Sequence, residues 1–234
     1  MTKIRIASAG WAAGLALLSQ AASADEGITL KAGAIDIVPH SSFTPLSGEF
    51  LPVNALGLHA REQTTLFLGA SHDLGDHFQV DLVGGIPPKH DIQLVVLDRS
   101  AVTPAIAAQD GAVVAKVTQF APNLLLNYRF GGSSAVVRPY LGAGVNYTRF
   151  IHTESTATND ALSGGPTHIH LTSSFGPAAQ AGALVKVNEQ WSLVADWLTA
   201  RVKSKVTNNT LGVVSTSRVT FRAQAFTLAA AYGF

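Results

Sequence analysis

The sequence predicts an all-β protein, an eight-stranded antiparallel transmembrane β-barrel with short periplasmic turns and longer extracellular loops. Residues 223–234 are uncharged and alternate large apolar side chains with small ones, as in a strand whose two faces meet different surroundings. Short and long connections alternate along the chain. The chain is 47% hydrophobic but only 13% charged. Beyond its first 24 residues, it lacks an apolar run long enough for a membrane-spanning helix.

The first 24 residues read as a secretory signal peptide. Lys3 and Arg5 give a basic start, residues 6–18 are apolar, and residues 22–24 fit a small-x-small cleavage site. A membrane anchor helix is disfavoured because thirteen apolar residues are too few to span a bilayer. We therefore expect two segments, a signal peptide at 1–24 and a barrel at 25–234. Without Lys3 and Arg5 the formal net charge changes from +1 to −1, which indicates no nucleic-acid partner.

The first four strands are expected near 27–38, 63–71, 77–86 and 116–130. The first places Ile28 and Leu30 on one face, and a tight turn at 73–76 separates the second strand from the third. The third alternates Phe78, Val80 and Leu82 with polar residues. Long loops are expected at 39–62 and from residue 87 to about residue 115.

The last four strands are expected near 136–150, 174–187, 191–202 and 219–234. The turns at 131–134 and 188–190 are short, whereas 153–171 and 203–218 read as long loops. An even strand number puts both termini on the periplasmic side. Aromatic residues beside the short turns predict an inner girdle of Phe78, Tyr128, Phe130, Trp191, Tyr232 and Phe234. An outer girdle would comprise Tyr147, Phe150, Trp197 and Phe221. A soluble β-sandwich explains neither the loop lengths nor the terminal strand.

Three stretches carry a family resemblance: 82–92 (LVGGIPPKHDI), 121–130 (APNLLLNYRF) and 138–148 (RPYLGAGVNYT), with weaker matches at 174–182, 191–193 and 232–234. On these residues the chain resembles the outer membrane protein W (OmpW/AlkL) family. The resemblance implies a narrow barrel whose hydrophobic lumen opens to the outside. It also implies uptake of small hydrophobic molecules that leave sideways into the membrane.

Strand parity assigns a polar set to the periplasmic half of the lumen. The plug candidates are Lys31, Asp81, Arg129, Lys186 and Asp196, together with Asn127. An eight-stranded barrel is just wide enough for its own side chains, so paired charges would block a continuous water pore. The alternative is that some of these groups lie at the membrane boundary.

Farther out, the inward positions become apolar. The candidates for lining a ligand site are Phe67, Val83, Phe120, Leu125, Val194 and Leu198. Such a lining favours an alkyl or aromatic guest through burial of apolar area. The alternative is ordinary filling of the barrel.

Prolines at strand ends predict a weak place in the wall. Pro87, Pro88 and Pro122 lack a backbone donor; the first two follow the predicted third strand directly, and Pro122 lies on the predicted fourth. We expect a lateral opening there, and replacing Pro122 with alanine would restore one donor. The alternative interpretation is a local bulge through which no ligand passes.

No catalytic residue, cofactor or metal site is predicted. His168 and His170 share a strand face, but a third ligand is not evident. Nothing in the sequence positions Ser163, His168 and Asp160 as a hydrolytic triad. A structural or adhesive surface barrel without transport is the alternative function. Expected partners are outer-membrane lipids and lipopolysaccharide, a small hydrophobic ligand and, through the C-terminal strand, the barrel-assembly machinery. The expected location is the outer membrane of a Gram-negative bacterium.

Overall fold

Eight antiparallel strands close into a ring in this computed structural model, which describes residues 27–40 and 54–234. The predicted signal peptide lies outside the described residues. In order around the ring the strands are β1 (Ile28–His40), β3 (Gln63–Leu74), β4 (Phe78–Gly85), β7 (Asn123–Arg129), β8 (Val137–Ser155), β10 (Ser174–Lys186), β11 (Trp191–Thr210) and β12 (Val213–Gly233). Pairing of β12 with β1 and of β8 with β10 closes the ring, which confirms the predicted fold class.

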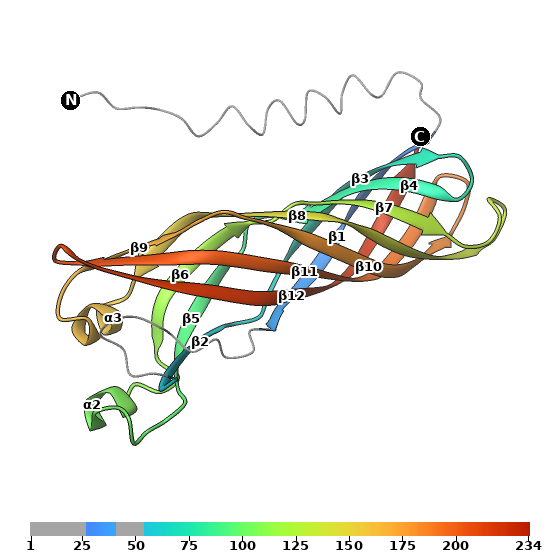
Figure 1. Ribbon diagram of the computed structural model, residues 1–234. Coiled ribbons are helices and arrows are strands. Elements are labelled where there is room, and N and C mark those ends of the chain that lie inside the picture. Colours follow the sequence, from blue (N-terminus) through green and yellow to red (C-terminus); the bar gives the residue numbers. More distant parts are fainter. Residues whose placement is uncertain (1–26, 41–53) are drawn as a thin grey trace, which may run out of the picture.

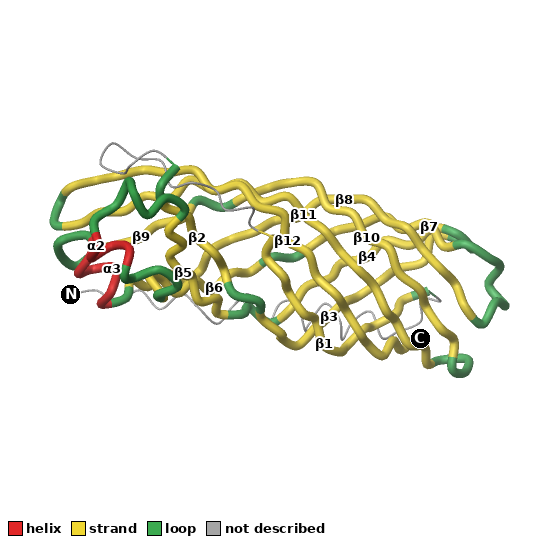
Figure 2. The backbone as a smooth tube through the Cα atoms, turned by 90° about the horizontal axis from the view of Figure 1, so that it is seen from below, coloured by secondary structure: helices red, strands yellow, loops and turns green. Residues whose placement is uncertain are grey.

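The two ends of the ring differ. The short turns and the C-terminus gather at one end, whereas β8, β11 and β12 run on past the other end (Figure 1). There they carry β2 (Leu56–Ala60), β5 (Lys89–Val96), β6 (Val113–Phe120) and β9 (Thr167–Leu171), with the short helices α2 (Pro104–Ala107) and α3 (Ala157–Leu162). We call this part the extension (Figure 2). Neither described helix is long and apolar enough to cross a membrane.

Several predicted boundaries were wrong. The expected fourth strand is two strands, β6 and β7, because the chain leaves the sheet at Ala121 and Pro122. The expected loop at 39–62 contains β2, and the expected loop from residue 87 contains β5. The expected loop at 153–171 contains α3 and β9, and 203–218 is no loop. Instead, β11 and β12 continue to a two-residue turn at Leu211 and Gly212, whose positive φ angles of 51° and 92° suit a hairpin. The outward lysines and arginines of this hairpin are typical of a loop, which explains the wrong prediction.

The terminal strand has the predicted orientation. On β12, Ala225, Thr227 and Ala229 are buried, whereas Phe226 is 51% and Leu228 71% exposed. Small inward residues allow close approach of the strands. At the β1–β12 seam, the Cβ of any residue replacing Gly33 would overlap the Leu228 carbonyl oxygen. The bulky residues therefore face outward and the small ones allow the ring to close.

Aromatic rings form the inner girdle where it was expected. Tyr128 contacts Phe78 and Phe130 edge-on, with centroids 5.4 and 5.1 Å away. Tyr232 likewise contacts Trp191 and Phe234, both at 5.0 Å. In the expected outer girdle, Tyr147 and Trp197 are exposed on the outer surface. Phe150 and Phe221 instead line a cavity in the extension.

A buried polar cluster fills the half of the barrel next to the short turns. Lys31 Nζ lies 2.8 Å from Asp81 Oδ2, and both side chains are almost fully buried. Asp81 also accepts hydrogen bonds from Ser71 (2.7 Å), Asn127 (3.1 Å) and Gln180 (3.2 Å). We call these five residues the Asp81 network. A buried ion pair is tolerated when further hydrogen bonds satisfy its polar atoms, as Ser71, Asn127 and Gln180 do here for the Asp81 carboxylate.

An apolar layer lies beyond the Asp81 network. Phe67, Leu125 and Val194 are each at most 2% exposed and pack in one cluster with Val83 and Leu198. Along β11 the inward residues continue through the buried Val202 before the wall of the cavity begins at Val206. Side chains thus fill the ring itself, as expected for eight strands.

We predict that Gly33→Ala destabilises the barrel by about 2 kcal/mol, because the added methyl must push β1 from β12. The free energy of unfolding in lipid vesicles, measured with urea, checks this. Gly132→Ala is the matched control, since its Cβ would meet no atom within 4 Å. Equal stability of the two variants would contradict the close packing of this seam.

Removing one partner of the buried ion pair is predicted to cost more. Asp81→Ala leaves Lys31 charged and buried, so the free energy of unfolding should fall by about 3–5 kcal/mol. The double variant Lys31→Met/Asp81→Leu removes both charges and should lose less than the single variant. If the double variant is the less stable of the two, the charges do not form the coupled pair described above.

Candidate functional site

The extension encloses a cavity of about 580 Å³ with no Lys, Arg, Asp or Glu among its described lining residues. One wall is formed by every second residue of the short strands, because alternate side chains of a strand point to the same face. These are Leu56, Leu58 and Ala60 of β2, His90, Ile92 and Leu94 of β5, and Ala115, Val117 and Gln119 around β6. The opposite wall comes from β9, β11 and β12, with Leu171, Val206 and Phe221 among its residues. Such a space suits an apolar guest.

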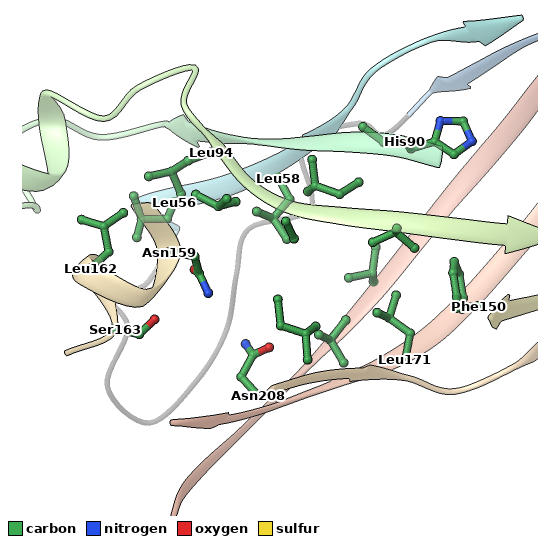
Figure 3. A pocket seen from close by; sticks show the side chains of 18 of the residues that line it. Leu56, Leu58, His90, Leu94, Phe150, Asn159, Leu162, Ser163, Leu171 and Asn208 are labelled. Carbon is green, nitrogen blue, oxygen red and sulfur yellow. The ribbon is translucent and has the colours of Figure 1, made fainter. Parts of the chain in front are cut away.

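Polar side chains lie at the two ends of the cavity (Figure 3). Asn159 and Ser163 lie at the end near α3, and His90 lies at the end nearer the ring. Asn208 lies on the opposite wall, between these two ends. The middle is formed by aliphatic side chains such as Leu58. A guest held there would contact mainly apolar side chains.

His90 is a neutral acceptor in this wall. Its Nδ1 lies 2.9 Å from the Arg61 carbonyl oxygen, which can only accept, so Nδ1 carries the proton. Burial lowers the pKa of His90, and the hydrogen bond to Arg61 opposes this only partly. Its Nε2 is buried without a partner in the part of the chain that the structure describes. A donor on a guest could satisfy this atom.

The residues predicted to line a ligand site lie elsewhere. Phe67, Val83, Leu125, Val194 and Leu198 do face inward, but they belong to the packed apolar layer of the ring and none lines the cavity. Phe120 is 36% exposed at the end of β6 and is also outside the lining. The alternation at 56–60, 90–94 and 115–119 was the available signal for the cavity. It was missed because these segments fell largely in predicted loops.

The plug candidates divide into three groups. Lys31 and Asp81 form the core of the Asp81 network. Arg129 is buried at the short-turn end, 2.8 Å from Asp73, and Asp196 accepts a hydrogen bond from Tyr140 at 3.1 Å. Lys186 is exposed at the end of β10 and takes no part in these contacts.

The wall of the ring is interrupted where the prolines stand. Pairing of β4 with β7 ends at Val83 and Asn123, and pairing of β5 with β6 begins only at Lys89 and Thr118. Within the described residues, one backbone hydrogen bond crosses the interval, from Gln119 N–H to the Pro88 carbonyl (3.3 Å). This interval, 84–88 against 119–122, is called the ladder interruption below.

The two proline sites contribute differently to the interruption. Ile86 bonds back to β3, as its N–H donates to Leu66. The N–H of the next residue would point to the other side, toward the interruption, but Pro87 has no N–H to donate. The Pro122 carbonyl accepts from Tyr147 of β8, and a residue's N–H and C=O point to the same side of a strand. A donor restored at position 122 would therefore face β8, so Pro122→Ala is not the direct test of this opening.

The histidine and triad candidates are not assembled into one site. His168 and His170 are exposed on β9, while Ile169 and Leu171 between and after them line the cavity. Asp160 accepts hydrogen bonds from Ser155 (2.6 Å) and from the Thr167 backbone (3.0 Å). Across 27–40 and 54–234, no group of three or more metal-ligating side chains was found.

The chain is similar in sequence to curated bacterial proteins, among them proteins named outer membrane protein W. The chain is 26% identical over 232 residues to outer membrane protein W of Vibrio cholerae, covering 94% of this chain and 97% of that protein. It is 29% identical over 152 residues to the dibenzothiophene metabolism operon protein PahQ of Pseudomonas aeruginosa, covering 64% of this chain and 61% of PahQ.

A solved structure matches the fold. The crystal structure of the outer membrane protein OprG from Pseudomonas aeruginosa superposes with a TM-score of 0.74 at 21% identity, covering 89% of this chain and 96% of OprG. The protein is accordingly placed in the outer membrane of a Gram-negative bacterium, as predicted. The OmpW family model matches residues 25–234, and the chain therefore belongs to the OmpW family.

Proposed function

We propose that this barrel is a passive conduit for small hydrophobic molecules. The molecules enter the cavity of the extension from outside and leave sideways through the ladder interruption into the membrane. The observation that carries the proposal is the cavity of about 580 Å³, which has no charged group among its described lining residues. A structural or adhesive barrel would need no such space.

The expected binding free energy of an apolar guest is small enough for the guest to leave the cavity again. A guest that buries about 200 Å² of apolar surface gains roughly 5 kcal/mol. Lost translational and rotational freedom offsets much of this gain. Weak binding follows, so a guest is drawn from water without being trapped.

The filled ring supports a sideways exit. The apolar layer and the Asp81 network lie between the cavity and the periplasmic end, and moving them would expose a buried charge pair. The ladder interruption begins six residues after Phe78 of the inner girdle, in the outer half of the membrane span. Gly84 and Pro122 still pack closely there, since a Cβ on Gly84 would lie 3.6 Å from the Pro122 Cα. Exit therefore requires the two strands to separate locally, with little backbone pairing to break.

A relative supports the class of ligand. The name of PahQ assigns it to a dibenzothiophene metabolism operon, and dibenzothiophene is a flat apolar aromatic compound. A guest of this kind fits a lining of leucine, isoleucine, valine and phenylalanine side chains.

Filling the cavity should block uptake. Ala115→Trp places an indole in the cavity and should lower the rate of uptake of a fluorescent naphthylamine probe at least fivefold in cells that carry the barrel. Lys116→Trp is the matched control, because the next residue of β6 lies on the opposite face of the strand. Uptake by Ala115→Trp at the wild-type rate, with equal amounts of folded protein, would contradict the proposal.

Locking the ladder interruption should have the same effect by another route. The chain has no cysteine, so Gly84→Cys/Pro122→Cys can form one defined disulfide across the interruption. Uptake should fall on oxidation and recover on reduction. Ala34→Cys/Leu228→Cys, across the continuous β1–β12 seam, should be insensitive to redox state. Equal sensitivity of both pairs, or of neither, would rule out this exit.

A further inference from the structure

Five cations gather on the outward face of the β11–β12 hairpin. They are Arg201, Lys203, Lys205, Arg218 and Arg222, all with exposed side chains, and we call them the basic stripe. Between Trp191 and Phe234 the sequence contains one acidic residue, Asp196, whose carboxylate accepts a hydrogen bond from Tyr140 (3.1 Å). The hairpin itself thus offers these cations no counter-charge on its outer face.

The strand register sets like charges against each other. Arg201 lies directly opposite Arg222, and Lys205 lies directly opposite Arg218. Like charges in directly opposed positions of an antiparallel pair are destabilising. Within the described residues, none of the five takes part in an ion pair. An anion bridging the two strands would relieve this repulsion.

The stripe lies at the height of the outer headgroups. A tilted strand crosses the hydrocarbon in about 9–11 residues. Arg201 is the tenth residue after Trp191 of the inner girdle, so it stands where β11 leaves the hydrocarbon. Just below it, the exposed Trp197 is paired with Phe226. The cations therefore lie next to an apolar surface that contacts acyl chains.

An exposed aromatic residue flanks the stripe on the neighbouring strand. Phe175 of β10 is 72% exposed. The preceding residue, Ser174, accepts a hydrogen bond from the Lys203 backbone N–H (2.9 Å), so Phe175 lies beside the cations. A ligand at this place meets charge and apolar surface together.

We propose that the basic stripe binds a phosphorylated glycolipid of the outer leaflet, namely the lipid A portion of lipopolysaccharide. The cations bind the phosphate groups of lipid A, and the acyl chains of lipid A lie against Trp197 and Phe226. Arginine and lysine near a membrane surface attract anionic headgroups, and guanidinium groups bind phosphate in a bidentate manner. A soluble polyanion could use the cations but not the apolar surface below them. This site is independent of the proposed conduit.

The test compares lipid A carrying both phosphates with lipid A stripped of phosphate, on the full-length processed protein in detergent. The variant Arg201→Gln/Lys203→Gln/Arg222→Gln should bind the phosphorylated lipid at least tenfold more weakly, by thermophoresis. The control Lys89→Gln/Arg99→Gln/Lys116→Gln removes the same charge from the extension and should bind as the wild type does. Lys89 and Arg99 have acidic partners of their own, Glu154 and Asp110.

Three outcomes would overturn the proposal. One is equal affinity for lipid A with and without phosphate. The second is equal weakening by both triple variants, which would reflect net charge alone. The third is binding of inorganic phosphate or heparin as tight as that of lipid A, which would make the stripe a general anion surface. Circular dichroism and heat-modified gel mobility establish that the variants are folded.

Discussion

The constraint on which the structure depends is that the membrane offers no hydrogen bonds to an unpaired backbone. Closure of β12 on β1 and of β8 on β10 satisfies this constraint around the ring. Glycine at position 33 and alanines at 229 and 231 let the strands approach, while Phe226 and Leu228 face lipid. Because pairing is nearly complete elsewhere, the ladder interruption between β4 and β7 is a distinct weak place in the wall.

Within the ring, the inward polar and apolar side chains are buried against one another, and the cavity lies in the extension. The Asp81 network and the Phe67 layer fill the barrel, whereas the extension holds a cavity because its short strands stand away from the β11–β12 hairpin. Length explains the difference: β11 and β12 have 20 and 21 residues, about twice what a membrane span requires. The ring, inside the membrane, is filled by side chains, and the extension, outside it, contains the cavity.

Sequence alone gave the ring with nearly correct strands, because alternation of large and small residues is a strong signal in 223–234. It also placed Lys31 and Asp81 among the inward charged residues, since parity carries over from strand to strand; that these two pair with each other came from the structure. The cavity was not foreseen, because Leu56, Ile92 and Ala115 sit on short strands whose pairing partners are far away in the sequence. The hairpin tip was misread because lysine and arginine on an outward face resemble a loop. Only register could show that Pro122 faces β8 rather than the interruption.

The most direct test of the central claim is to locate a bound guest. A nitroxide-labelled apolar probe added to methyl-labelled protein in lipid bilayers should broaden the methyl signals of Leu58, Ile92 and Leu94, which line the cavity. The signals of Val194 and Leu125, buried in the ring, should keep their intensity. Broadening confined to outward residues such as Leu126 and Leu228 would show that the probe only dissolves in the bilayer, and would contradict the account.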